Sequence, residues 1–423
     1  MKEIVTLLQN RNFVHLWVSQ IISQIVINTL SFLMLIYLFE KTGSTIATSF
    51  VWLAYALPAI LFGPIAAVTA DLVDKRKALV LTLIVQAITV SVYAFLFQRY
   101  IYMAYAIVFI YSLANQFYIP SEAATIPLLV KQKILPFANS LFFVTVQLGL
   151  AVGFLLAGVS YEYLGLGKSL ILSAAFLFLA ASSVSLLPKL AALEHVPKDF
   201  AGGVGKFFSE LLEGYQFIKD TKRILMPFFL LIGLQVALSI IVVTMPAMAE
   251  DVVRVRASLA GVAIVVPGAL GALVASILVP RAISEGVTRK KVIEISLFCL
   301  SVALVLLGFA VLRLPFWLGR TLAVACFFVA GASYVGSLIP TLTHLQLSTP
   351  KDKLGRVFGS IWFITTAATV LPVIFSATIT EVFGVSLTVA LLGLMGFVVL
   401  LMAQVQSPSV FQAKIKLLGK RTK

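Results

Sequence analysis

Charged residues are scarce in this sequence. Only 12% of its 423 residues are Asp, Glu, Lys or Arg, and 61% are hydrophobic. A soluble domain usually carries about 25% charged and about 45–50% apolar residues. A soluble protein of this composition would lack the polar side chains needed to cover its surface. The composition therefore excludes an ordinary soluble protein and indicates one that crosses a membrane several times.

Cysteine and histidine are also rare. The two cysteines, Cys299 and Cys326, lie in apolar runs and are expected to pack as small hydrophobic residues. The three histidines, at positions 15, 195 and 344, are far apart in the sequence. These features disfavour a disulfide framework and a Cys/His metal cluster, so we expect neither a metal nor a cofactor.

The usual signatures of enzymes are missing from the sequence. It contains no G-x-x-x-x-G-K-[ST] loop for nucleotide phosphates. Its apolar runs hold no paired acids and no histidine cluster that would suggest acyl or phosphoryl chemistry. We therefore do not expect an enzyme.

Long runs without any charged residue are, in contrast, abundant. A helix needs about 20 residues to cross a bilayer, and backbone groups in hydrocarbon must find their hydrogen bonds within the helix. The sequence therefore predicts an all-α integral membrane protein with twelve membrane helices. The runs are 12–39, 42–70, 78–98, 100–121, 134–161, 169–188, 224–249, 257–280, 295–312, 321–350, 357–380 and 382–413.

The charges that remain are mostly basic, with 32 Lys and Arg against 17 Asp and Glu. An even number of spans places both termini on one side. The segments on that side carry 25 basic residues, and those on the other side carry 7. Basic residues gather on the cytoplasmic side, so we expect both termini in the cytoplasm and the protein in the cell (inner) membrane. Anionic headgroups, rather than nucleic acid, then account for the positive net charge.

A long polar stretch divides the spans into two sets of six. We interpret 1–187 as an N-terminal six-helix bundle, 188–223 as a cytoplasmic linker, 224–405 as a C-terminal six-helix bundle, and 406–423 as a basic cytoplasmic tail. Apolar residues between 204 and 217 recur at helical spacing. They favour an amphipathic helix on the inner membrane face, with a solvated linker as the alternative.

The two halves resemble each other in sequence. A shift of 220 residues aligns Ile119-Pro120 with Ile339-Pro340, and Ser140 with Ser360. Parallel repeats of this kind are typical of secondary transporters in which two helix bundles rock against each other.

Particular motifs add a family resemblance. Gly63, Asp71, Asp74, Lys75 and Arg76 match the signature loop between spans two and three of the major facilitator superfamily, although Leu72 stands where that family usually has Arg. Within it, the chain resembles the branch of macrolide-efflux and enterobactin-exporter proteins, near the lysophospholipid transporters. The residues that carry this resemblance are 120–124, 126–130, 135 and 138–141 in the first half, and Pro340, Gln346, Pro350 and 355–357 in the second. The resemblance covers essentially the whole chain. It implies two pseudo-symmetric six-helix bundles and alternating access.

The same resemblance implies a conformational latch at the inner ends of the helices. Its residues are Gly63, Asp71, Asp74, Lys75 and Arg76 in the first half, and Gly355 and Arg356 in the second. The Asp71 carboxylate can accept helix N-terminal N–H groups or pair with a basic residue, which would close the inner side. A simple stop signal at the end of span two is the alternative.

Amide side chains inside the spans are the candidates for binding substrate. Unpaired amides are costly in lipid, so they should face the interior of the bundle. The candidates are Gln20, Gln24, Asn28, Asn115, Gln116, Gln147 and Gln235. The first three recur every four residues and share one face of span one. They line a substrate cavity or join helices by hydrogen bonds, and the sequence leaves both interpretations open. Gly149, Gly153 and Gly158 in span five should allow close helix packing.

Acidic residues are absent from the middle of every span. Relatives often carry a Gly-Asp pair in span one, where this sequence has Ile27-Asn28. Glu122 follows Pro120, where we expect a break in span four, and it is our candidate for proton coupling. An interfacial charge at a helix end is the alternative.

These features favour a secondary active transporter that exports hydrophobic or amphipathic small molecules, of drug, macrolide or siderophore type, and is driven by protons. A lipid or lysophospholipid flippase of the same fold and a non-transporting membrane sensor are the alternatives. The expected partners are the small-molecule substrate, the lipid bilayer and protons. We expect a monomer that does not bind nucleic acid.

Overall fold

The computed structural model describes residues 2–132, 134–189, 200–350 and 353–405, and this part of the chain is helical without any strand. The first half contains α1 (Lys2–Gln9), α2 (Arg11–Thr42), α3 (Thr45–Leu72), α4 (Lys75–Leu96), α5 (Met103–Leu129) and α6 (Leu135–Ser185), and α7 (Phe200–Asp220) follows it. The second half contains α8 (Lys222–Ala247), η1 (Met248–Val253), η2 (Ala257–Leu259), η3 (Gly261–Val265), α9 (Val266–Ser284), α10 (Arg289–Phe309), η4 (Val311–Arg313), α11 (Phe316–Ser348), α12 (Leu354–Phe383) and α13 (Val385–Val405).

The prediction of twelve membrane helices is confirmed. Nine segments within the described residues are long and apolar enough to cross a membrane. One of them, 137–185, turns back at Gly165, whose φ of 72° and ψ of 172° are not helical, and therefore makes two crossings. The shorter apolar helix α13 and the more polar α5 complete the twelve.

The third membrane helix of each half, α4 and α10, begins with a side-chain N-cap. The Asp74 carboxylate accepts a hydrogen bond from the Lys77 amide at 3.3 Å and caps α4. The Thr288 hydroxyl accepts from the Lys291 amide at 3.3 Å and caps α10. Such caps satisfy amides that would otherwise lack a partner at a helix start.

The prolines of α5 do not break it, and this part of our interpretation is wrong. The helix runs through Pro120 and Pro127 to Leu129. A proline removes one hydrogen bond and forces a local distortion, but a helix can absorb both where neighbouring helices pack around it. Glu122 consequently lies inside α5 and not at its end.

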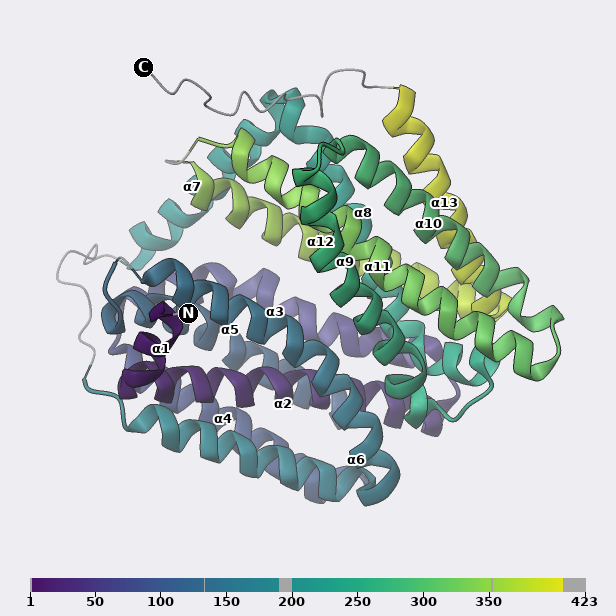
Figure 1. Ribbon diagram of the computed structural model, residues 1–423. Coiled ribbons are helices and arrows are strands. Elements are labelled where there is room, and N and C mark those ends of the chain that lie inside the picture. Colours follow the sequence, from purple (N-terminus) through teal and green to yellow (C-terminus); the bar gives the residue numbers. More distant parts are fainter. Residues whose placement is uncertain (1, 133, 190–199, 351–352, 406–423) are drawn as a thin grey trace, which may run out of the picture.

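The helices form two halves joined by α7. In the first half, α6 packs on α2 and α4, while α5 packs on α3 and α4; in the second, α11 packs on α9 and α10, and α13 packs on α10. Figure 1 shows the first half in purple to blue beside the second half in green to yellow, with α7 at one edge. The halves meet mainly through α3 against α12, and through α6 against η2 and η3.

Successive membrane helices run in opposite directions, so the connections between them lie alternately at two opposite ends of the molecule. We call the end with α1, α7 and the starts of α4 and α10 the terminal face. We call the opposite end, with Gly43, the Gly165 turn, η1 to η3 and Gly384, the hairpin face.

Large apolar side chains are exposed along the outside of the helices. On α4 they include Leu81, Ile88 and Phe95, which recur every seven residues and share a face. On α9 they include Leu270, Leu273 and Ile277. Surfaces as apolar as these are expected to contact lipid.

Candidate functional site

The amide stripe of α2 lies against α6. Gln20 is 1% exposed, and its Nε2 donates to the Phe142 carbonyl at 3.1 Å. Further along, Gln24 and Asn28 are half-buried, and the Asn28 Nδ2 donates to the Gln24 carbonyl at 2.7 Å. The Gln20 hydrogen bond directly supports a helix-joining role for that residue. Substrate contact by the half-buried Gln24 and Asn28 stays a prediction.

Two glycines of α6 make room for this stripe. A Cβ at Gly149 would lie 2.9 Å from the Gln24 Cβ, and one at Gly153 would lie 2.5 Å from the Asn28 Cβ. Thr29 also donates to the Gly153 carbonyl at 3.0 Å. The predicted close packing at these glycines is confirmed. Two glycines four residues apart on one helix face two amides four residues apart on the other, a match that the sequence already contained.

The other candidate amides lie on different helices and do not form one cluster with the stripe. Asn115 is buried in α5, and the neighbouring Gln116 is half-buried, with its Nε2 3.4 Å from the Ser112 carbonyl. Gln147 is exposed on α6, and Gln235 is half-buried on α8. Their role in substrate binding stays a prediction.

Glu122 lies in the interior of the first half. Its side chain is 8% exposed, and Oε1 accepts a hydrogen bond from the Tyr118 hydroxyl at 3.1 Å. The Tyr118 hydroxyl also lies 3.3 Å from the Ser19 Oγ on α2. No ion pair to Glu122 is found among the described residues. A buried carboxyl with one hydroxyl partner and no cation can exchange a proton without breaking a salt bridge.

The predicted latch in the first half is only partly visible. Asp74 caps α4, Arg76 is half-buried, and Gly63 lies within α3 with open space beside it. Lys75 is 1% exposed, and its Nζ makes no hydrogen bond within the described part of the chain. The side chain of Asp71 lies outside the described part, so its proposed pairing stays a prediction.

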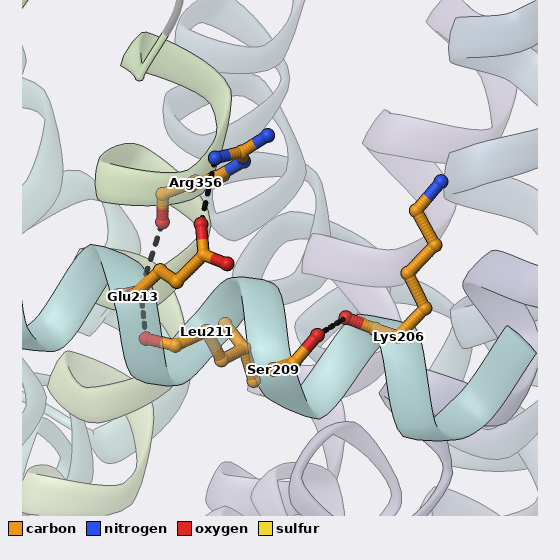
Figure 2. Close-up of polar contacts among 6 residues, drawn as sticks. Lys206, Ser209, Leu211, Glu213 and Arg356 are labelled. Atoms are coloured by element: carbon orange, nitrogen blue, oxygen red, sulfur yellow. Dashed lines mark hydrogen bonds and ion pairs between the residues drawn. The ribbon is translucent and has the colours of Figure 1, made fainter. Parts of the chain in front are cut away.

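The latch residue Arg356 in the second half pairs with α7. Its Nη1 donates to the Glu213 Oε2 at 2.6 Å (Figure 2). The Ser360 Oγ donates to the Leu211 carbonyl at 2.8 Å, and a Cβ at Gly214 would collide with Ser360 and with the Arg356 carbonyl. The α7 helix is therefore fastened to the start of α12. Gly355 is exposed with open space around it.

This junction was not predicted from the sequence. Two features of the sequence could have indicated it: Gly214 in the middle of an amphipathic helix, and Ser360, which aligns with Ser140 in the internal repeat. The helix itself, Phe200–Asp220, is longer than the predicted stretch 204–217, and it exposes the apolar side chains of Phe208, Leu212 and Tyr215. The basic tail 406–423 lies outside the described residues.

Polar contacts between the two halves gather toward the hairpin face. Glu162 of α6 accepts from Arg256 and Ser258, both at 2.6 Å. Glu381 of α12 accepts from the Ser44 hydroxyl at 2.7 Å and the Ile46 amide at 3.0 Å. Two further bonds lie deeper: the Thr48 hydroxyl to the Val243 carbonyl at 3.2 Å, and the Trp52 Nε1 to the Thr369 hydroxyl at 3.1 Å.

No hydrogen bond between described residues joins the two halves directly at the terminal face. There, α7 lies between them, fastened to α12 and packed on α3. The structure is therefore held shut at the hairpin face by direct contacts, and at the terminal face the halves are linked through the helix α7.

Two helix bundles that contact each other at one face are an architecture found in many membrane transporters. The family model of the Major Facilitator Superfamily matches residues 16–371, and the chain belongs to this family. It is therefore a multi-pass membrane transporter.

Relatives with curated sequences agree with this assignment. The chain is 26% identical to the uncharacterized MFS-type transporter YfiS of Bacillus subtilis (strain 168), over 84% of this chain and 83% of that protein. It is 31% identical over 124 residues to the macrolide efflux protein A of Streptococcus pyogenes, which covers 29% of this chain and 31% of that protein.

Solved structures share the fold. The nucleoside transporter NupG (D323A mutant) superimposes with a TM-score of 0.75 at 14% identity, over 94% of this chain and 99% of that one. A bacterial homolog of the human lysosomal transporter Spinster, in an inward-facing and unoccupied conformation, superimposes with a TM-score of 0.69 at 13% identity, over 93% and 95% of the two chains. At these identities the likeness extends to the fold alone.

Proposed function

We propose that the protein is a secondary active transporter that exports hydrophobic or amphipathic small molecules by alternating access, with protons as the coupling ion. The observation that carries the proposal is the scarcity of buried charge. Among the described residues, the only buried Asp, Glu, Lys or Arg side chains are Lys75 and Glu122. Sugars, phosphates or organic acids would call for more charged or strongly polar groups in the interior.

The partial similarity to a macrolide efflux protein supports the same class of substrate. A hydrophobic or amphipathic substrate binds mainly through apolar contacts, with a few polar groups such as amides to orient it. The buried Asn115 and half-buried Gln24, Asn28, Gln116 and Gln235 supply the amides. In this proposal they line the path between the halves, and Gln147 lies exposed beside it.

Glu122 is the proposed proton-coupling residue. It is the one buried acid among the described residues, and its partner Tyr118 lies one turn away on the same helix. Gain or loss of its proton would change the charge inside the first half, and this change would require no second ionised group. In a proton-coupled exporter, the free energy of this change in charge has to differ between the inward-open and the outward-open state.

Transport by purified protein in proteoliposomes tests the proposal. With an imposed pH gradient, we expect uphill movement of a labelled macrolide, and collapse of the gradient should stop it. The Glu122→Gln variant should retain downhill exchange and lose uphill transport. The Glu285→Gln variant changes an exposed carboxylate at the end of α9 and serves as the matched control. Uphill transport by Glu122→Gln at the control rate would overturn the coupling role.

A lipid substrate is the second candidate, and one feature favours it. An open apolar groove of about 540 Å³ runs between α3 and α5. It is lined by Phe50, Leu53, Ala54, Leu57, Tyr105, Ala106 and Phe109. A fluorescent lysophospholipid assayed in the same proteoliposomes separates the two candidates, because a flippase would move it while leaving the macrolide behind.

We also propose that both termini and the linker α7 face the cytoplasm of the cell (inner) membrane, and that the protein works as a monomer. The excess of basic residues on the terminal face supports this orientation. The exposed apolar side chains of α7 suit contact with the inner leaflet of the membrane. In this orientation, the structure is closed toward the outside of the cell.

A further inference from the structure

Glu162 and Glu381 occupy matching positions in the two halves. Each stands three residues before a glycine with positive φ, Gly165 at 72° and Gly384 at 87°. Each of these glycines turns the chain back from the fifth helix of its half into the sixth. The two carboxylates therefore hold equivalent places before the turn from the fifth helix to the sixth in each half.

Each carboxylate reaches from its own half into the other. Glu162 of the first half binds the side chains of Arg256 and Ser258, which precede η3 and α9 in the second half. Glu381 of the second half binds Ser44 and the Ile46 amide, at the start of α3 in the first half. The fifth helix of the first half is the part of α6 before Gly165, and it binds the segment that leads into α9, the second helix of the second half. The fifth helix of the second half is α12, and it binds the start of α3, the second helix of the first half.

The backbones of the two halves also approach each other closely beside the Glu162 contact. A Cβ at Gly158 of α6 would collide with the Ser258 carbonyl, and a Cβ at Gly261 would lie 2.6 Å from the Phe154 carbonyl. Below Glu381, the Trp52–Thr369 hydrogen bond also joins α3 to α12, and the Thr48–Val243 hydrogen bond joins α3 to α8 of the second half. The carboxylates thus lie where separation of the halves has to begin.

We propose that Glu162 and Glu381 are paired gate residues that hold the hairpin face closed, and that the molecule opens there only when both carboxylates release the opposite half. We call the Glu162–Arg256–Ser258 contact the first clamp, and the Glu381–Ser44–Ile46 contact the second clamp. Their role is independent of the substrate and of the direction of transport.

The two clamps differ in chemistry. The first clamp contains an ion pair whose arginine side chain is 73% exposed, and salt screens such pairs. The donors of the second clamp are a hydroxyl and a backbone amide at a helix N-terminus, where the helix dipole also favours the carboxylate. Salt should therefore weaken the first clamp much more than the second.

Distances between spin labels test the gate without any substrate. Labels at Lys168→Cys and Trp317→Cys report on the hairpin face, because these exposed residues lie on opposite halves. Labels at Lys77→Cys and Glu285→Cys, which are likewise exposed on opposite halves, report on the terminal face. Both pairs are introduced with Cys299→Ser and Cys326→Ser, in protein reconstituted into lipid nanodiscs.

We expect the parent to show mainly the short distance at the hairpin face. Glu162→Gln and Glu381→Gln should each raise the ratio of open to closed molecules about three- to tenfold, and the double variant should raise it further. The distance at the terminal face should shorten in step. The donor-side variants Arg256→Gln and Ser44→Ala should change the distances in the same direction, which separates loss of a clamp from a fault of one variant.

Glu40→Gln is the matched control. Glu40 accepts a hydrogen bond from Tyr161 at 2.7 Å at the same face, but both residues belong to the first half. Its distance distribution should equal that of the parent. A double Glu162→Gln, Glu381→Gln variant that stays monodisperse and keeps the parent distances would overturn the proposal.

Salt dependence provides an independent measurement. In the Glu381→Gln variant only the first clamp remains intact, so raising KCl from about 0.05 M to about 0.5 M should increase the open fraction further. The Glu162→Gln variant retains the second clamp and should respond weakly. An equal response of the two variants would overturn the assigned difference between the clamps.

Discussion

The Tyr118 hydroxyl donates to the Glu122 carboxylate at 3.1 Å, one helical turn away on α5. Tyr118 is fully buried and Glu122 is 8% exposed. The same hydroxyl lies 3.3 Å from Ser19 on α2, so a hydroxyl–hydroxyl–carboxyl chain links two helices of the first half. A buried polar group that loses its hydrogen-bond partner destabilises the fold, because no water replaces the lost hydrogen bond.

The first prediction follows from this pair. Tyr118→Phe removes the hydroxyl and leaves the Glu122 carboxyl without its tyrosine donor, so we expect a loss of about 1–3 kcal/mol in the free energy of unfolding. Thermal unfolding in detergent, followed by tryptophan fluorescence, measures the effect as a lower Tm. Tyr163→Phe removes a hydroxyl from a side chain that is 82% exposed and should leave the Tm unchanged. Equal Tm values for the two variants would show that the hydrogen bond does not stabilise the fold.

The second prediction concerns the packing of α2 on α6. Gly153→Ala places a Cβ 2.5 Å from the Asn28 Cβ and 2.8 Å from the Ile25 carbonyl. The helices have to move apart, which we expect to cost about 1–3 kcal/mol of stability. Gly233→Ala in α8 is the control, because open space surrounds it and alanine favours a helix by about 1 kcal/mol over glycine. Both variants are compared by Tm, and a Gly153→Ala protein as stable as the parent would contradict this account.

Much of this fold could be predicted because the bilayer imposes a simple rule on the sequence. Uncharged runs of about 20 residues have to become helices, and this rule gave twelve crossings and the turn between 161 and 169. The rule says nothing about which helix faces which. The spacing of Gln20, Gln24 and Asn28 predicted that they share a face, but only the structure shows that this face lies on α6.

The contacts between the halves could not be predicted for the same reason. Glu162 and Ser258 are 96 residues apart in the sequence, and Ser44 and Glu381 are 337 apart. Their pairing depends on how the two bundles meet, which no local pattern encodes. The expected break at Pro120 was wrong because local propensity was outweighed by packing around α5.

The third prediction concerns Asp74, which the family resemblance assigned to a latch. The structure shows its carboxylate capping α4 at 3.3 Å. Asp74→Ala should therefore lower the free energy of unfolding by about 1 kcal/mol, while Asp74→Ser should restore most of it, because serine is also a good N-cap. If Asp74 instead acts mainly as a charged latch, Asp74→Ser should fail as badly as Asp74→Ala in a transport assay while matching the parent in Tm.

The fourth prediction concerns the junction of α7 with α12. Ser360→Ala removes the side-chain hydrogen bond to the Leu211 carbonyl, and Arg356→Gln removes the ion pair with Glu213. The ion pair is 42% and 55% exposed, so its loss alone should cost at most about 1 kcal/mol. Hydrogen–deuterium exchange of residues 205–219 should speed up more in the double variant than in either single one. Unchanged exchange in the double variant would show that apolar packing alone holds α7.

The last prediction tests the orientation in the membrane. Lys206 on α7 and Lys168 after the Gly165 turn are both exposed, and they lie at opposite faces of the molecule. Single cysteines at these positions, in a background with Cys299→Ser and Cys326→Ser, should react differently with a membrane-impermeant maleimide. Because 25 basic residues lie on the side of the termini and 7 on the other, position 168 should react in intact cells and position 206 only after the membrane is opened. Reaction of position 206 in intact cells, with position 168 protected, would reverse the assigned orientation and place the closed hairpin face toward the cytoplasm.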